Sequence, residues 1–432
     1  MMINMYLRGS KWSVRNRPRR RSNPVLLAVL IGLIGIGVYF NQVIVPTVPP
    51  LFVPTPTPTR SPESYLNEAE QLYQQGKLTQ AIDAYKQAIV ADPYNPSIYV
   101  TLARLQVFAG EYQDAITNAQ NALLKNSNNP LAHAVLGWAQ GFTGDYLSAE
   151  AEIKKAIELD PNNALAHAFY AEILINQGDV DNLDKAIEES RVAMQLDSSL
   201  LEVHRARGLV LLNTGTENLD QAINEFKAAI AINSKIADLH LNLGYAYKLK
   251  GENDLAVEEL LAAYSLNPND WTSLVEISLA YANEGQFGKA AQYAEQAMKV
   301  DPSNPKLHGN LGIMYYRNQE MNKAVQELAL AVQGGKMDDG TVVQGIPLAY
   351  GTVEQYYWFY GFALAKTNHC DEAVKVFEAL LSGVPDDQLA VDNANAGLDL
   401  CLQMTTTQTP GPVTTEQPSL TESPTTEITP TP

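Results

Sequence analysis

Residues 131–161 read LAHAVLGWAQGFTGDYLSAEAEIKKAIELDP, and this order of small, turn-forming and apolar residues returns along most of the chain. Small Gly137 is followed seven positions later by Gly144, then by Ala149, and the unit closes at Pro161. Small residues let two antiparallel helices approach closely, while glycine ends the first helix and proline ends the second. The stretch therefore predicts a helical hairpin.

The same pattern recurs in nine consecutive units. Its small position holds Ala69, Ala103, Gly137, Ala171, Gly208, Gly244, Ser278, Gly312 and Gly361. Its turn position holds Gly76, Gly110, Gly144, Gly178, Gly215, Gly251 and Gly285, then Gln319 and Asn368. One such hairpin cannot bury its apolar face alone, so neighbouring hairpins must stack into a single elongated array.

The repeat resembles the tetratricopeptide repeat family in its order of small residue, glycine turn, alanine and closing proline. The resemblance covers nine units at about residues 63–385, within an array that extends to residue 403. It implies an all-α, right-handed superhelical solenoid of about nine hairpins. Residues 386–403 are expected to form a capping helix. Residues 333–353 interrupt the eighth unit, and they either form a functional loop or fold back over the array.

The N-terminal residues predict a membrane anchor. Residues 1–23 carry seven basic and no acidic side chains, and residues 24–40 carry no charge. Extended through residue 45, the apolar segment would be about 33 Å long as a helix, which is enough to cross a bilayer. A cleavable signal peptide is the alternative, but Tyr39 and Phe40 do not supply the small residues that precede a cleavage site.

The basic head at residues 1–23 should stay in the cytoplasm. This orientation predicts a single-pass protein of the cell membrane, with its repeats outside the cytoplasm. Residues 46–62 contain seven prolines and predict a semi-rigid stalk, and the Thr/Pro-rich residues 404–432 predict a disordered tail. The chain has 30 basic residues, and seven of them lie in the head, so 23 basic residues stand against 48 acidic ones in the rest. This negative charge disfavours nucleic acid as a partner.

The histidines follow the period of the repeat. Five of the six fall at the fourth position of a first helix: His133, His167, His204, His240 and His308. Equivalent atoms of neighbouring helices lie about 8–10 Å apart, whereas zinc needs each ligand within about 2.1 Å. We therefore expect packing residues and neither a metal nor a cofactor. No phosphate-binding GK[ST], HExxH or paired CxxC motif indicates an enzyme.

The two cysteines fall on elements that should be antiparallel neighbours. Cys370 opens the second helix of the ninth unit, and Cys401 lies near the end of the expected capping helix. The end of that helix would then lie beside the turn, close enough for a disulfide. Oxidation is expected outside the cytoplasm. We predict a disulfide, with two buried free thiols as the alternative.

The family geometry implies which side chains of the first helices face the concave groove. These predicted peptide-binding residues are Arg104, Phe108, Trp138, Phe142, Phe169, Asn242, Tyr245, Asn310, Tyr316, Trp358 and Phe362. The alternative for each of them is packing against the next hairpin. An apolar and aromatic lining suits an extended or helical peptide segment.

Together these features predict a membrane-anchored, non-enzymatic scaffold that binds a protein or peptide segment and helps to assemble an envelope complex. No small-molecule substrate is expected. Two alternatives stay open. The chain could be an accessory subunit of an envelope enzyme, with residues 333–353 completing the partner's active site, or a membrane-tethered assembly factor that faces the cytoplasm.

Overall fold

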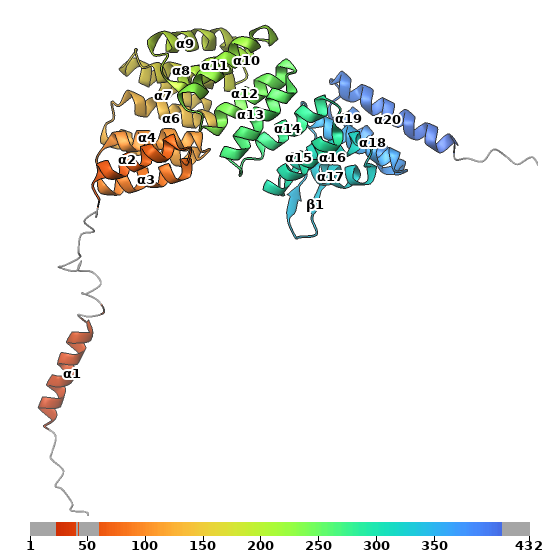
Figure 1. The fold of residues 1–432 in the computed structure, drawn as a ribbon. Helices are drawn as coiled ribbons and strands as arrows, with labels where there is room; N and C mark the ends of the chain where they lie inside the picture. The colour runs from red at the N-terminus through yellow and green to blue at the C-terminus, as the bar shows by residue number, and fades with distance from the viewer. Residues whose placement is uncertain (1–22, 40–41, 43–59, 408–432) are drawn as a thin grey trace, which may run out of the picture. The chain divides into compact units, whose positions relative to one another are not determined.

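The computed structural model describes residues 23–39, 42 and 60–407, and it divides into two compact units at residue 59. In the first unit, α1 (Pro24–Tyr39) is a 16-residue apolar helix with exposed side chains (Figure 1). None of the described helices has the length and apolar character needed to cross a membrane. The predicted head (1–23) and stalk (46–62) fall almost entirely outside the described residues, as does the predicted tail beyond residue 407.

The second unit contains nine helical hairpins within residues 60–407, as the repeat predicts (Figure 1). The first helices are α2 (Pro62–Gln74), α4 (Pro96–Phe108), α6 (Pro130–Phe142), α8 (Ala164–Asn176), α10 (Leu201–Asn213), α12 (Ala237–Lys250), α14 (Thr272–Asn283), α16 (Pro305–Arg317) and α18 (Glu354–Lys366). The second helices are α3 (Leu78–Ala91), α5 (Tyr112–Lys125), α7 (Tyr146–Leu159), α9 (Leu183–Leu196), α11 (Leu219–Ile232), α13 (Asn253–Leu266), α15 (Phe287–Val300), α17 (Met321–Gln333) and α19 (Cys370–Gly383). The short 3-10 helices η2 (Val180–Asn182) and η3 (Thr216–Asn218) lengthen the turns before α9 and α11.

Local chemistry sets where each hairpin begins and turns. At the start of α6, the Asn129 side chain accepts the backbone N–H of Ala132 at 3.1 Å, and Pro130 occupies the first turn. Such caps satisfy backbone donors that have no partner within the helix. At the turn, Gln319 and Asn368 adopt positive φ values of 66° and 63°, and glycine takes a positive φ at this position in the other seven units. The predicted turn position is therefore confirmed.

The small position is where the two helices of a hairpin approach most closely. A Cβ atom on Gly137 would lie 2.7 Å from the backbone oxygen of Ala149 and 2.8 Å from Cγ1 of Ile153. Both distances are too short for a side chain, which explains why this position carries small residues. From α4 onward, each first helix also contacts the first helix of the next hairpin.

The periodic histidines link the two helices of their own hairpin. Nδ1 of each lies 2.5–2.6 Å from a glutamate on the second helix, and Nε2 lies 2.8–3.1 Å from a backbone oxygen of the preceding turn. The pairs are His133–Glu152, His167–Glu189, His204–Glu225, His240–Glu259 and His308–Glu327. The histidines thus serve as polar links as well as packing groups. The described residues contain no group of His, Cys, Asp and Glu side chains that could hold a metal ion.

Residues 333–353 fold back onto the array, as one of the two interpretations of this segment predicts. The antiparallel strands β1 (Gly334–Lys336) and β2 (Val342–Gln344) pair with Gly335 opposite Val343, whose side chain is buried. Farther on, Ile346 donates its N–H to the backbone oxygen of Ala331 at 2.9 Å. Tyr357 of α18 donates its hydroxyl to the backbone oxygen of Ile346 at 2.8 Å.

The last helix caps the array. α20 (Gln388–Thr407) packs on α18 and α19. It begins two residues later and ends four residues later than the predicted capping helix at 386–403. Cys370 and Cys401 form a disulfide with Cα atoms 5.4 Å apart. The structure therefore confirms the pairing predicted from the antiparallel arrangement.

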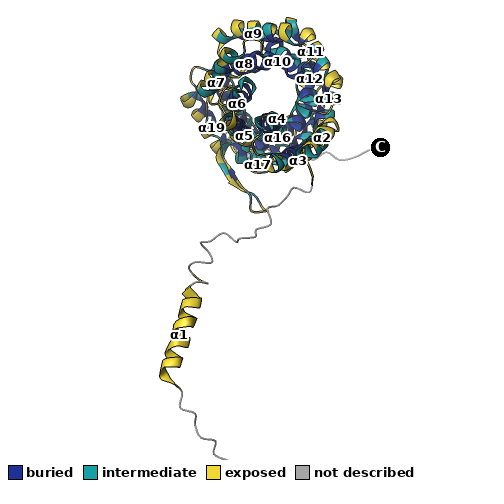
Figure 2. Ribbon diagram, turned by 90° about the vertical axis from the view of Figure 1, so that its left-hand side faces the viewer, coloured by how far each residue is buried: buried dark blue, intermediate teal, exposed yellow. Residues whose placement is uncertain are grey.

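The first part of the array curves until its beginning meets its middle. In Figure 2, α6, α8, α10 and α12 surround an open centre, and α7, α9, α11 and α13 lie outside them. Ile236 and Leu239 of the sixth hairpin share a buried cluster with Ile82 and Ile98 near the N-terminal end of the array. A Cβ atom on Gly76 would lie only 2.8 Å from Cβ of Lys235. The first hairpin therefore closes against the sixth.

Candidate ligand-binding cavity

A cavity of about 540 Å³ lies inside this first turn of the array. The surrounding segments come from distant parts of the sequence, including α4, α6, α10, α12 and the loop before α14. The lining side chains that bear on its chemistry are Phe108, Glu111, Tyr112, Trp138, Phe142, Arg205, Asp238, Asp270 and Trp271. Its volume falls in the range of ordinary ligand pockets, about 300–1,000 Å³.

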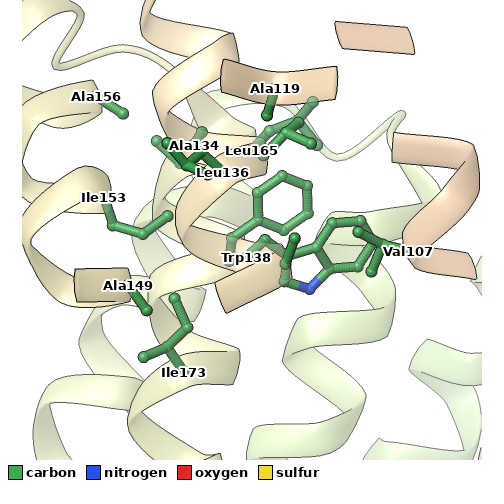
Figure 3. Close-up of a cluster of buried hydrophobic side chains, with 14 of the residues drawn as sticks. Val107, Ala119, Ala134, Leu136, Trp138, Ala149, Ile153, Ala156, Leu165 and Ile173 are labelled. Carbon is green, nitrogen blue, oxygen red and sulfur yellow. The ribbon is translucent and has the colours of Figure 1, made fainter. Parts of the chain in front are cut away.

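One wall of the cavity is aromatic. Trp138 stacks on Phe169 with ring centroids 4.2 Å apart and meets the edge of Phe108 at 5.3 Å. Phe142 lies 5.9 Å from Trp138 and stacks on Tyr112 at 4.8 Å. Figure 3 shows Trp138 within a buried cluster that includes Val107, Leu136 and Leu165. Packing on both sides holds these rings in fixed positions at the cavity.

A buried charge network stands beside the aromatic wall. The indole N–H of Trp138 donates to Oε2 of Glu172 at 2.7 Å. The guanidinium of Arg205 pairs with Glu172 through Nη1 and donates from Nε to Oδ2 of Asp238 at 2.5 Å. It also lies 5.8 Å from the centroid of the Trp138 ring and 5.9 Å from that of Phe142. Arg205 thus joins α8, α10 and α12 across the floor of the cavity.

Burial and pairing oppose each other in this network. Burial raises the pKa of Glu172, while Arg205 and Trp138 favour its charged form. Burial alone would lower the pKa of Arg205, but Asp238 and Glu172 raise that pKa above its ordinary value. Arg205 therefore keeps its positive charge and is held against the aromatic rings by carboxylates on either side.

Sequence comparison identifies the repeating unit. Two models described as tetratricopeptide repeat match, one at residues 72–139 and 281–337 and the other at 132–163 and 237–270. A model described as TPR repeat matches residues 216–251. The array is built from tetratricopeptide repeats. Among curated proteins, none matches the sequence significantly.

Solved structures share the fold of the tetratricopeptide array. The APC/C hetero-tetramer Cut9–Hcn1 aligns with a TM-score of 0.54 at 14% identity, over 77% of this chain and 55% of that one. The chain thus spans about half the length of that relative. The human IFIT1 dimer with m7Gppp-AAAA aligns with a TM-score of 0.51 at 20% identity, over 81% of this chain and 83% of that one. The tetratricopeptide fold generally binds protein or peptide partners.

The predicted groove residues of α4, α6 and α8 divide between the cavity and the core. Phe108 and Phe142 line the cavity and are partly exposed. Trp138 and Phe169 stack on each other and are 1% and 0% exposed, in keeping with the alternative of packing against the next hairpin. Only Trp138 of that pair borders the cavity. Arg104 forms an ion pair with the buried Glu202, with Nε and Oε1 3.4 Å apart.

The predicted residues of α12 do not line the cavity and have partners within the array. Nδ2 of Asn242 donates to the backbone oxygen of Asp238 at 2.9 Å and to its carboxylate at 3.1 Å. Tyr245 is 38% exposed, and Nζ of Lys248 lies 4.7 Å from its ring centroid. Tyr245 is therefore more accessible to a partner than Asn242 is.

The remaining predicted residues lie in the last third of the array, apart from the cavity. Oδ1 of Asn310 accepts the hydroxyl of Tyr356 at 3.1 Å. Phe362 packs against Phe377 with ring centroids 5.3 Å apart. Two further aromatic rings meet near Phe359: Tyr316 lies 5.1 Å from it and Trp358 lies 6.4 Å from it. Of the eleven predicted groove residues, three thus line the cavity: Phe108, Trp138 and Phe142.

Sequence reasoning missed the three charged residues of the network. Glu172, Arg205 and Asp238 occupy the ninth, fifth and second positions of α8, α10 and α12. These are positions that the family geometry directs toward the concave side, and their charges alternate. This alternation of charge across three consecutive repeats is the sequence feature that could have indicated the network. It predicts contacts between the three side chains only when the axial offset between neighbouring helices is known.

Proposed function

We propose that the tetratricopeptide array is a non-enzymatic scaffold that binds a segment of a partner polypeptide in the cavity of its first turn. The main support for the proposal is the cavity, because it combines fixed aromatic rings and charged groups in a space of about 540 Å³. Such a mixture of apolar contact and a few convergent polar groups is typical of specific binding sites. The acidic lining disfavours nucleic acid as the ligand.

Photo-crosslinking from inside the cavity tests this proposal. A benzophenone amino acid at Trp271 of the full-length chain should yield one defined protein adduct in the native cells. The matched control is Tyr94, an aromatic residue that is 79% exposed and does not line the cavity. Adducts of equal yield from Tyr94, or adducts with lipid or glycan alone from the cavity positions, would contradict the proposal.

The same proposal includes a membrane anchor at residues 24–45. Support comes from α1, whose 16 residues are uncharged and exposed, and from the basic residues that precede it. Apolar side chains that none of the described residues covers gain free energy when they leave water. Alkaline carbonate extraction should leave the full-length chain in the membrane pellet. A variant lacking residues 24–45 should appear in the supernatant.

We further propose that the array lies outside the cytoplasm, where it helps to assemble an envelope complex. The disulfide between Cys370 and Cys401 supports this location, since disulfides persist in oxidising compartments. The basic head at residues 1–23 supports the same orientation. An alkaline phosphatase fused after residue 403 should be active and a green fluorescent protein there should be dark. The opposite pair of results would place the repeats in the cytoplasm.

A further inference from the structure

The cavity of the first turn carries an excess of negative charge. Within the described part of the chain, Arg205 is the only basic side chain that lines it, whereas Glu111, Asp238 and Asp270 are acidic. Glu172 and Asp238 already neutralise Arg205. No ion pair among the described residues involves Glu111 or Asp270, so these two charges are not balanced by the array.

The two remaining acids are held in place by neutral donors. Asp270 accepts the backbone N–H of Thr272 at 2.9 Å and its hydroxyl at 2.5 Å, both through Oδ1. Glu111 accepts the side-chain amide of Gln106 at 3.1 Å through Oε2. These bonds orient the carboxylates without cancelling their charge, which preorganises them for a cation.

The aromatic ring of Tyr112 stands next to acidic groups of the cavity. Tyr112 directly follows Glu111 in the chain. Burial raises the pKa of Tyr112, and Asp238 and Asp270 raise it further while Arg205 opposes them, so Asp238 and Asp270 both act on this ring. Tyr112 in turn stacks on Phe142, and Trp271 lies in the same lining. A cation over an aromatic face gains about 0.5–2 kcal/mol, more where water is excluded.

Arg205 shows which chemistry this lining accepts. Its guanidinium lies between the carboxylates of Glu172 and Asp238 and over the rings of Trp138 and Phe142. A second basic side chain in the cavity would meet the same kinds of group in Asp270, Glu111 and the Tyr112 ring. Anionic side chains and phosphates would instead meet uncompensated negative charge.

We infer that the cavity recognises an arginine or lysine side chain of the partner segment, placed between the acids Glu111 and Asp270 and the aromatic ring of Tyr112. This inference rests on the proposed function and adds the chemical class of the ligand. The partner is thus a polypeptide with a basic residue in an extended stretch. Its charge is opposite to that of the array and its uncharged neighbours contact the aromatic wall.

Positional-scanning peptide libraries test the inference. Blocked hexapeptide mixtures are fixed at one position as arginine, lysine, citrulline or glutamate and presented to the full-length protein in detergent. Arginine and lysine mixtures should be retained. Citrulline, the neutral isostere of arginine, should bind about tenfold more weakly because it lacks the charge-assisted contacts. Glutamate mixtures should not be retained.

A charge-neutralised variant assigns the effect to the cavity. Glu111→Gln with Asp270→Asn should weaken binding of the selected arginine peptide about tenfold and leave its citrulline twin unchanged. The control is Glu258→Gln with Glu378→Gln, which removes two exposed acids outside the cavity. Circular dichroism confirms that both variants are folded.

The outcomes separate this inference from the function on which it rests. Retention of neutral or acidic mixtures in preference to basic ones overturns the basic ligand and leaves a peptide-binding scaffold. Equal weakening by the two double variants overturns the assignment to the cavity. Failure of every mixture to bind, together with absence of adducts from Trp271, overturns both proposals.

Discussion

At the scale of single residues, Arg205 connects three repeats through its ion pairs. It contacts Glu172 of α8 and Asp238 of α12 while it belongs to α10, so one side chain joins three consecutive repeats. Glu172 is 1% exposed and Arg205 is 4% exposed. Removing one member of a buried ion pair leaves the other charge without a partner, which costs more than the pair itself contributes.

We expect Arg205→Met to destabilise the array by about 3–5 kcal/mol at neutral pH. The loss should be smaller at about pH 5, because burial raises the pKa of Glu172 and the uncompensated carboxyl then takes up a proton. Adding Glu172→Gln should restore much of the stability. Urea unfolding followed by circular dichroism measures each step. A double variant no more stable than Arg205→Met would refute the explanation.

Trp138 illustrates why the site was harder to predict than the fold at this scale. Its place in the repeat predicted a groove residue, and in the structure it borders the cavity. Its exposure depends instead on Phe169, which stacks on it from the next repeat. Helical periodicity assigns a side chain to a face, but the neighbouring helix decides how much of that face remains open.

At the scale of the hairpin, the histidine–glutamate links introduce a dependence on pH. Hydrogen bonds to glutamate raise the pKa of His167, His204 and His240, although burial opposes them. The pKa of His308 is also raised, because its bonds to Glu327 and Pro302 outweigh burial. Both ring nitrogens have acceptors, so the protonated imidazolium is the form that the folded state favours.

The sign of this dependence follows from linkage. A histidine whose pKa is raised by folding contributes stability in full below its unfolded pKa, about 6.5, and loses that contribution as pH rises through the folded pKa. The free energy of unfolding should therefore fall as pH rises above about 6.5. Glutamine at positions 167, 204, 240 and 308 together should flatten this part of the profile. An unchanged slope in the quadruple variant would contradict the assignment.

The capping helix gives a second prediction at the scale of the element. The disulfide between Cys370 and Cys401 closes a loop of sequence separation 31, which is worth about 3–4 kcal/mol on the chain-entropy estimate. Cys401→Ala should lower the free energy of unfolding by about this amount. Hydrogen exchange should increase in α20 before it increases in the rest of the array. Reduction of the native protein should reproduce both effects. Reduction should leave the variant unaffected, and any further change would point to a different cause.

For the whole molecule, the repeat period predicted the nine hairpins but not the closure of the first turn. Each hairpin is specified by residues within its own unit, so its pattern is visible in the sequence. In the third hairpin these residues are Gly137 at the helix contact and Gly144 at the turn. Closure depends on small rotations between hairpins that add up over several repeats. The contact of Gly76 with Lys235, and the cavity that it encloses, therefore become visible only in three dimensions.

Closure should depend on the ion pair between Arg104 of the second hairpin and Glu202 of the fifth. Glu202 is 3% exposed, so an acid placed opposite it meets a charge that water does not screen well. Arg104→Glu should therefore open the turn. Spin labels at Gln80 and Lys235, both exposed, should report a longer and broader distance than in the parent protein.

The exchanged pair tests whether charge is the cause. Arg104→Glu with Glu202→Arg restores an acid beside a base and should return the label distance to its original value. The exchanged pair should also restore the affinity for any ligand of the cavity, because the segments that line the cavity come from both ends of the closed turn. If the exchanged pair stays open, the two side chains hold the turn through shape rather than charge. If Arg104→Glu alone leaves the distance unchanged, the apolar cluster around Ile236 and Leu239 suffices to close it.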